Sequence, residues 1–512
     1  MQHLSSARIN KIVIGIIFCL LLFTAYLPLI SKVNFMQNDD WYYYSQVQRF
    51  LSFNFKLLPQ IAPVFYLQGA ISTLFSLLFG LNNIPFLTMA IAVLNIFVFY
   101  LILTSILHKD IFTSLILSLT LFFNPLFQYS LIGFMTEQYF LFFLLCSLYF
   151  FLKFEIIPNY INLIFSNIFV SLGFLVRQVS LVFSLALFLY FLINRKWKIA
   201  LYQILFTLVM VFLYLLLPKT PEMLSKTYQL QHLLNFHYIY AVFYGSLIYL
   251  AAFSIPILIL VAIGAFQKIS TRTIILTVLF AFVLYFIMQI PFKPMSVSWG
   301  EFPYFENTWE RTGFMARDII GTKYQFRGIF DLYKHWDITA KVVLSLFLST
   351  FFLVKRLRKK ILSFEAIYLS VYMMLMFLTI TFYDRYILVM LPILLIWFAK
   401  MLNTNQRVSW LLMGAFALFL AFYSYNFISD FVLRESFVWE KTIKLQGLVS
   451  ANSAWNEKNN IDTTNVRYIF SYDSPRVGGD KLEGLRLIEE NRIEFPLSLF
   501  IKPNVYLYER SL

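Results

Sequence analysis

Two adjacent carboxylates stand where they could do acid-base chemistry. Asp39 and Asp40 follow the first long apolar run and directly precede the aromatic residues 41–44. A carboxylate at an apolar boundary can keep a raised pKa and act as a general base, and an adjacent pair could also hold a cation. The same residues are good helix N-caps, because Asp side chains accept hydrogen bonds from the first helical turn. The spacing alone leaves both catalysis and capping open.

A third acid, Glu137, begins another apolar run after the break at Asn124-Pro125. Thr136 could cap a helix there, and Glu137 would then be a favourable acid in the first turn. A catalytic role gains support only because the expected topology puts Glu137 on the same membrane face as Asp39.

Two arginines are candidates for binding an anion. Arg177 separates two apolar runs, where it should seek a carboxylate or a phosphate such as that of a lipid. Snorkelling to the membrane surface is the alternative. Arg385 lies in a short polar corner, residues 383–386, where a local pair with Asp384 is the simplest explanation.

Cysteine and histidine give no sign of a metal site. Cys19 and Cys146 both fall inside expected spans and have neither a metal-ligand spacing nor a disulfide framework. His232 and His237 are five residues apart, which does not match the spacing of metal ligands on a helix face. We therefore expect no metal ligand among them.

The composition indicates an integral membrane protein. Of the 512 residues, 60% are hydrophobic and 13% are charged, whereas soluble domains are about 45–50% apolar. The net charge of +15 does not indicate nucleic-acid binding, because the basic residues form short clusters between apolar runs, as at 195–198 and 355–360. Such clusters are typical of cytoplasmic loops. We expect the lipid bilayer as a partner and no nucleic acid.

The apolar runs predict an all-α polytopic domain with about thirteen spans. With the N-terminus in the cytoplasm, the short basic loops fall on the cytoplasmic side, and residues 31–85, 218–237, 292–337 and the tail fall outside. The expected spans are residues 11–30, 86–107, 111–129, 138–153, 160–176, 179–193, 199–217, 238–266, 274–291, 338–354, 362–382, 386–402 and 408–427.

Residues 59–80 decide this topology. Counted as a span, they would export every later basic cluster, or would require an external N-terminus that misplaces Arg8 and Lys11 and puts Asp39 in the cytoplasm. Because the stretch contains proline, glutamine and serine, we expect a membrane-surface or re-entrant helix. A second surface helix is predicted just before it by residues at helical spacing: Trp41, Tyr44, Val47 and Leu51.

The chain is expected to divide into a transmembrane domain, residues 1–427, and a soluble extracytoplasmic domain, residues 428–512, where charges become frequent. The second should be a small α/β unit with an amphipathic segment at 430–455, strands at 466–472 and 505–508, and a helix at 481–491. The loop 292–337 is dense in aromatic and charged residues, which is typical of lids and binding loops.

Three groups of these residues resemble motifs of the GT-C superfamily of membrane glycosyltransferases, which includes protein O-mannosyltransferases and bacterial enzymes that transfer aminoarabinose to lipid A. The groups are Asp39-Asp40, the segment from Asn124-Pro125 to Met135-Thr136-Glu137, and Asp384-Arg385-Tyr386 to Pro392. They look like the family's acidic pair after the first span, its segment ending in Met-Thr-Asp, and its late Arg-Tyr and proline segment. Glu137 departs from the usual aspartate. The likeness covers about residues 11–425, and the tail adds little to it.

The resemblance implies transfer of a sugar from a polyprenyl-phosphate-linked donor to an extracytoplasmic glycolipid, glycan or protein, with inversion at the anomeric carbon. Asp39 would be the general base, and Asp40 or Glu137 would position it or stabilise developing positive charge. Arg177 and Arg385 would bind the donor phosphate. No cofactor is required by the resemblance, and a divalent metal stays open.

Two other classes of membrane protein stay open as alternatives. A transporter or flippase of lipid-linked glycans would also need many spans, but such proteins often show internal repeats and charges at mid-membrane, which this sequence lacks. A glycan polymerase or ligase is a closer alternative. The chain has no Asn-x-Ser/Thr sequon, which favours a bacterial inner-membrane protein.

Overall fold

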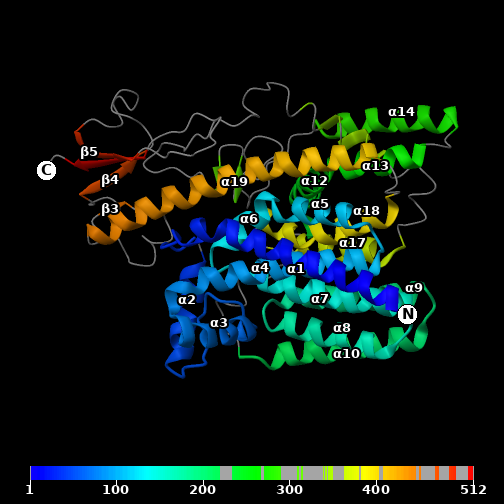
Figure 1. The fold of residues 1–512 in the computed structure, drawn as a ribbon, viewed down its shortest axis with the longest axis horizontal. Helices are drawn as coiled ribbons and strands as arrows, with labels where there is room; N and C mark the ends of the chain where they lie inside the picture. The colour runs from blue at the N-terminus through cyan, green and yellow to red at the C-terminus, as the bar shows by residue number, and fades with distance from the viewer. Residues whose placement is uncertain are drawn as a thin grey trace.

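The fold is that of a computed structural model, in which the long helices lie side by side along the longest axis of the molecule (Figure 1). The N-terminus lies at one end, and the helices of the first loop lie with the C-terminal strands at the other. The prediction puts these two ends on opposite sides of the membrane. The residues that the structure describes are 2–37, 39–218, 233–266, 270–289, 308–310, 313–314, 338, 341–342, 344–346, 348–349, 362–379, 382–402, 407–445, 449–450, 467–471, 484–491 and 505–510.

The bundle is built from helices that pack in sequence-adjacent and distant pairs, among them α7 with α8, α9 with α10, α1 with α4 and α5 with α19. The helices are α1 Gln2–Ile30, α2 Asp40–Leu51, α3 Tyr66–Phe79, α4 Ile84–Leu101, α5 Ile111–Phe122, α6 Pro125–Ile132, α7 Thr136–Ile156, α8 Tyr160–Phe174, α9 Leu181–Ile193, α10 Trp197–Leu216, α12 Phe236–Ala252, α13 Ile255–Phe266, α14 Thr271–Ile287, α17 Phe364–Met376, α18 Leu391–Met401 and α19 Arg407–Lys444.

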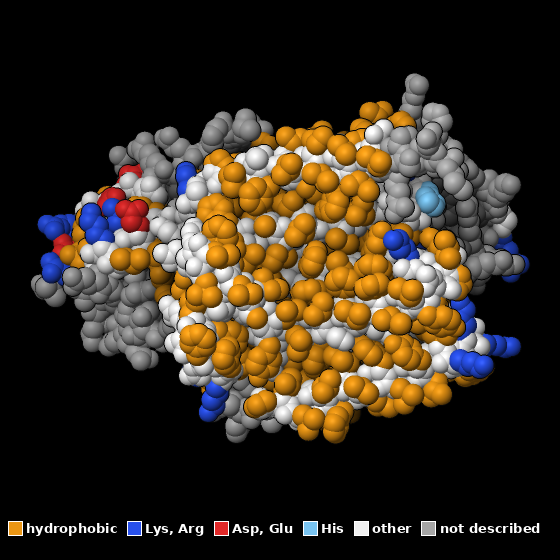
Figure 2. Space-filling model, turned by 60° about the horizontal axis from the view of Figure 1, so that its bottom comes forward, with side chains coloured by type: hydrophobic (Ala, Val, Ile, Leu, Met, Phe, Trp, Pro, Cys, Tyr) orange, Lys and Arg blue, Asp and Glu red, His pale blue; other side chains and the backbone are white. Residues whose placement is uncertain are grey.

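Five described helical segments are long and apolar enough to cross a membrane: Ile9–Ile30, Leu81–Ile106, Thr136–Ile156, Trp197–Leu216 and Trp410–Lys444. The bent pair α5 and α6 would make a sixth if it forms one broken span. Figure 2 shows a broad face of the molecule covered by hydrophobic side chains, with Lys and Arg side chains towards its two ends. These features agree with the predicted membrane protein, and the count of thirteen spans stays a prediction.

Several predicted spans are interrupted at polar or proline residues. Asn124 caps α6 through its side chain, Pro125 follows it, and the axes of α5 and α6 meet at 65°. The run 238–266 is divided into α12 and α13 by a turn at Phe253 and Ser254. The run 386–402 begins with a 3₁₀ segment, Asp384–Val389, before α18. Breaks of this kind re-aim the chain where a site is built.

The stretch 59–80 contains α3, which has 14 residues and so falls short of the roughly 20 that a straight span needs. Its polar side chains, Gln68, Ser72 and Ser76, are buried, whereas Leu74, Leu77 and Leu78 are exposed. A helix that hides its polar face and exposes its apolar face fits a lipid environment better than water. The helix predicted before it is α2.

The C-terminal strands form one sheet in the order β3-β4-β6-β5, with β3 parallel to β4 and the other pairs antiparallel. The strands are β3 Val449–Ser450, β4 Tyr468–Ser471, β5 Leu485–Asn491 and β6 Val505–Arg510. A separate hairpin in the long loop joins β1 Trp309–Glu310 to β2 Gly313–Phe314. The strands predicted at 466–472 and 505–508 are therefore confirmed.

The helix predicted at 481–491 is wrong for the described part of this segment, because Leu485–Asn491 form strand β5. Leu485 and Ile488 stand three residues apart, as on a helix face. The pairing with β6 instead carries an irregularity between Leu487 and Glu489, which disturbs the strict alternation of a strand. The amphipathic segment predicted at 430–455 begins as the end of α19, which continues without a break across residue 428.

A buried polar network joins α8, α9 and α10. Gln203 exchanges two amide hydrogen bonds with Asn167, at 3.0 and 3.2 Å, and donates to Ser184 at 2.9 Å. Ser184 in turn contacts Thr207 at 2.6 Å. Because each partner is buried, losing one would leave others unsatisfied in an apolar environment.

We therefore expect Gln203→Leu to lower the free energy of unfolding by about 1–2 kcal/mol. The measurement is thermal unfolding of the purified protein in detergent. Leu205→Ala on the same helix is the matched control, because Leu205 faces outward and is exposed, so its truncation should change little. Equal stability of Gln203→Leu and the wild type would contradict a structural role for the network.

Candidate functional site

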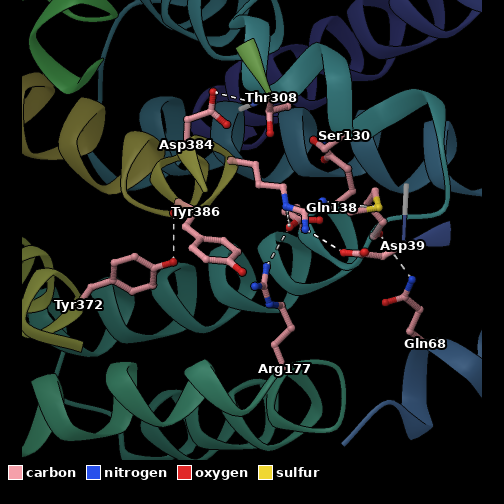
Figure 3. Close-up of polar contacts among 12 residues, drawn as sticks. Asp39, Gln68, Ser130, Gln138, Arg177, Thr308, Tyr372, Asp384 and Tyr386 are labelled. Carbon is pink, nitrogen blue, oxygen red and sulfur yellow. Dashed lines mark hydrogen bonds and ion pairs between the residues drawn. The ribbon is translucent and has the colours of Figure 1, made fainter. Parts of the chain in front are cut away.

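Four charged side chains from distant segments meet near the first loop (Figure 3). Arg385 donates to Asp39 at 2.9 Å, and its Nε lies 3.6 Å from Glu137. Arg177 donates to the same Glu137 oxygen at 3.1 Å. The result is a continuous chain of ion pairs, Asp39 to Arg385 to Glu137 to Arg177. Asp39, Glu137, Arg177 and Arg385, all predicted as site residues, are thus brought together.

Breaks between helices present these charges. Glu137 lies in the first turn of α7, which begins directly after the bend at residues 133–135. Arg177 follows the end of α8, where the carbonyl of Leu175 accepts hydrogen bonds from the first residues of α3. Arg385 lies in the 3₁₀ segment that precedes α18. Charged groups at such breaks can meet without breaking the hydrogen bonds of a spanning helix.

The capping alternative for Asp39 is not what the structure shows. Asp39 occupies the N-cap position of α2, but its side chain makes no capping hydrogen bond and binds Arg385 instead. The local pair predicted for Arg385 is also wrong, since its two ion pairs are with Asp39 and Glu137 rather than with Asp384. Likewise, Arg177 reaches inward to a carboxylate and does not snorkel.

Asp40 has a different environment from its neighbour. Its side chain is buried and accepts hydrogen bonds from the backbone N–H of Phe134 at 2.9 Å and of Gln37 at 3.4 Å. Burial raises the pKa of Asp40 to about 7, while these two hydrogen bonds act in the opposite direction. Asp40 therefore ties the segment before α2 to the bend before α7, and it positions Asp39.

Gly133 makes this tie possible. A Cβ at this position would lie 2.6 Å from Oδ2 of Asp40 and would overlap the side-chain oxygen of Gln37. The Gln37 amide also donates to the carbonyl of Tyr129 at 2.8 Å. Only a residue without a side chain lets the two segments approach so closely. Gly133 was missed as a site residue, although it stands beside the Met-Thr-Glu segment.

Aromatic rings line the charged cluster. The Arg177 guanidinium lies over the ring of Tyr386 at 5.3 Å, and that of Arg385 over the ring of Tyr383 at 4.8 Å. Tyr43, one helical turn after Asp39, stacks on Phe65 with ring centroids 4.9 Å apart. Tyr43 was missed as a site residue, and its spacing of four from Asp39 is the signal that could have found it.

The four charged side chains differ in how much of their surface is exposed. The side chain of Asp39 is 43% exposed, whereas those of Arg385, Glu137 and Arg177 are 7%, 2% and 19% exposed. The cluster contains two arginines and two carboxylates outside Asp40, so its charges balance. Asp39 is thus the most exposed of the four charges, and the buried arginine beside it can hold it in place.

Part of the long loop docks beside this cluster. The buried carboxylate of Asp384 lies 3.3 Å from the backbone N–H of Thr308 and 3.5 Å from the hydroxyl of Tyr249. The rest of the loop 292–337, apart from residues 309–310 and 313–314, lies outside the described residues, as does His232.

Among the residues that the structure describes, no group of three or more His, Cys, Asp or Glu side chains is arranged to hold a metal ion. Asp39 and Glu137 instead share the guanidinium of Arg385. A guanidinium thus supplies one positive charge between these two carboxylates.

The close approach at Gly133 can be tested with Gly133→Ala. We expect the variant to lose about 1–3 kcal/mol of stability, because the added methyl group must push Asp40 and Gln37 away. Gly414→Ala is the matched control, since its Cβ would have a nearest neighbour at 3.8 Å, an ordinary contact. Thermal unfolding in detergent measures both, and equal effects at the two glycines would contradict the argument.

The raised pKa of Asp40 predicts a pH-dependent stability. Between its ordinary value near 4 and about 7, the folded protein keeps the proton that the unfolded chain has lost, so stability falls by about 1.4 kcal/mol per pH unit. Asp40→Asn cannot ionise and removes this dependence. The melting temperature of the variant relative to the wild type should therefore rise from about pH 5 to about pH 7 and level off above. If the difference in melting temperature between Asp40→Asn and the wild type did not change with pH, the raised pKa of Asp40 would be refuted.

Comparison of the sequence with models of protein families and with characterised proteins, and of the fold with solved structures, found no match for this chain.

Proposed function

We propose that the protein is a membrane glycosyltransferase that moves a sugar from a polyprenyl-phosphate-linked donor to a hydroxyl group on the extracytoplasmic side of the membrane. The acceptor is a glycolipid, a glycan or a protein. The proposal rests on the resemblance in sequence motifs and on the geometry around Asp39. It places the protein in a bacterial inner membrane with the N-terminus in the cytoplasm.

The observation that carries the proposal is the partly exposed carboxylate of Asp39, held at 2.9 Å by a buried arginine. A general base must be accessible to the acceptor hydroxyl and fixed in orientation. Asp40 and Glu137 meet only the second condition, because both are buried. This supports Asp39 as the base, with Asp40 and Glu137 as positioning residues.

The reaction needs one bond to form and one to break. The acceptor oxygen attacks the anomeric carbon, its proton passes to Asp39, and the bond from that carbon to the phosphate oxygen breaks. Direct displacement inverts the anomeric centre. Polyprenyl phosphate leaves with an additional negative charge, which nearby guanidinium groups would stabilise.

Arg177 and Arg385 are the candidates for that phosphate. Within the described part of the chain, the guanidinium of Arg177 donates a single hydrogen bond, to Glu137, so further N–H groups are available to a ligand. Arg385 joins the base to the same cluster, which would place base and phosphate next to each other. A divalent metal bound with the donor stays open.

The bundle also offers the donor an apolar environment for its tail. The outward side chains of α3 and α10 are mostly leucine and phenylalanine, among them Leu77, Leu78, Leu205 and Phe212. The loop before α3 packs on both neighbours of Arg177, α8 and α9, and on α10 through a small apolar cluster around Val64, Phe174 and Met210. A lipid-linked substrate could thus approach the charged cluster from the side of the bilayer.

Asp39→Asn should lower kcat for sugar transfer by about 10²–10⁴-fold, because the amide cannot accept the proton. For the assay, the purified protein is reconstituted in liposomes together with radiolabelled polyprenyl-phosphate sugars extracted from the organism that makes the protein. The release of polyprenyl phosphate is then measured. Asp110→Asn is the matched control, since Asp110 caps α5 and Asn is also a good N-cap.

Full activity of Asp39→Asn would refute the catalytic assignment.

Deletion of the protein should remove one sugar from envelope glycans, as judged by mass spectrometry. Accumulation of complete lipid-linked glycan in the deletion strain would instead favour a flippase, a polymerase or a ligase.

A further inference from the structure

The loop that joins α2 to α3 presents two phenylalanines to the outside. Residues 52–56 are all exposed, and within them the side chains of Phe53 and Phe55 are 84% and 62% exposed. Large aromatic side chains seldom protrude from a protein surface in water unless they contact something else. These two stand two residues apart in the chain, just after the end of α2.

The backbone of this loop is held in an unfavourable shape. Phe53 has φ of 59°, a left-handed conformation that bulky residues rarely adopt. The loop is closed by hydrogen bonds between Asn54 and Arg49, backbone to backbone at 2.8 Å and side chain to side chain at 3.3 Å. Phe53 thus adopts a rare backbone conformation without burying its ring in the protein core.

A buried glutamine fixes the second half of the loop. Gln46 accepts a hydrogen bond from the backbone N–H of Leu58 at 2.8 Å and donates to the carbonyl of Lys56 at 3.2 Å. Phe55 also touches Phe50 on α2, with ring centroids 5.6 Å apart. The two exposed rings thus belong to a loop whose backbone is held in place by hydrogen bonds to α2.

The surroundings of the loop identify its partner. Helix α3, which follows this loop, exposes three leucines, Leu74, Leu77 and Leu78, so the first loop carries further apolar surface. The charged residues in and next to this loop, Arg49 and Lys56, are both basic, and Lys56 is exposed. Aromatic rings flanked by cations at the edge of an apolar belt match the interface of a phospholipid bilayer.

We propose that the loop 52–56 is a lipid-inserting wedge, in which Phe53 and Phe55 enter the outer leaflet while Lys56 and Arg49 contact phospholipid phosphates. The occupant of this surface is the bilayer that surrounds the bundle, including its anionic lipids. Lipid insertion by this loop does not depend on sugar transfer, so either proposal can be refuted without affecting the other.

Spin labelling measures the insertion directly. Single-cysteine variants Phe53→Cys and Phe55→Cys are made in a background in which the buried Cys19 and Cys146 are replaced by alanine. Each is labelled with a nitroxide and reconstituted in vesicles of phosphatidylethanolamine and phosphatidylglycerol. Accessibility to oxygen, which concentrates in lipid, is compared with accessibility to a water-soluble nickel chelate.

Two exposed positions calibrate the result. Leu205 is exposed on α10 within the predicted span 199–217, and Glu440 is exposed on α19 beyond the predicted span 408–427, so Leu205→Cys and Glu440→Cys serve as the lipid and water references. We expect labels at positions 53 and 55 to prefer oxygen over the nickel chelate, as at Leu205, with at least a several-fold difference from Glu440. Labels that behave like that at Glu440 would overturn the wedge. Labels shielded from both reagents would also overturn it, because they would indicate a protein partner.

A second variant separates insertion from folding. Phe53→Asn suits the left-handed backbone and removes a side chain that has little contact with the protein, so its melting temperature in detergent should equal or exceed that of the wild type. In vesicles, the same change should make the label at position 55 at least twofold more accessible to the nickel chelate. An unchanged accessibility at position 55 would show that Phe53 does not insert.

Discussion

The arrangement depends on a single buried carboxylate that two arginines share. Glu137 is 2% exposed and lies within ion-pair distance of both Arg177 and Arg385. A guanidinium removed from water costs several kcal/mol unless it is paired, so each arginine needs this acid. The pairing therefore fixes three segments that are far apart in the sequence: the start of α7, the connection of α8 to α9 and the 3₁₀ segment before α18.

The two adjacent acids differ because their surroundings differ. Asp40 faces inward to backbone N–H groups at a point that only Gly133 leaves open, whereas Asp39 faces the arginine and remains partly exposed. One carboxyl group has its pKa raised by burial and serves as a structural tie, and the other is available to a ligand. Neighbouring carboxyl groups with different surroundings can take different roles in one site. Here the division follows from the direction of each side chain on leaving the N-terminus of α2.

The sequence predicted most of what depends on hydrophobicity and little of what depends on long-range packing. The helices follow from long apolar runs, and the candidates Asp39, Glu137, Arg177 and Arg385 follow from charges at the ends of those runs. Which arginine would meet which acid could not be predicted, because every pair is made between segments remote in sequence. Strand β5 was taken for a helix, since its pairing irregularity with β6 hides the alternation of a strand. Gly133 was missed because a close approach of two segments leaves no trace in a single sequence.

The length of α2 connects the two proposals physically. Its 12 residues extend over about 18 Å, with Asp39 at one end and the loop of Phe53 and Phe55 at the other. A helix anchored in lipid at one end and ion-paired to Arg385 at the other has little freedom to tilt or rise. A donor whose phosphate lies at the head-group level presents its reacting carbon at a depth set by the bilayer, and a base on the protein must be held at that same depth. With Asp39 as the proposed base and the loop 52–56 as the proposed lipid anchor, two anchors on this short helix would meet the requirement, because the lipid would then set the height of the carboxylate.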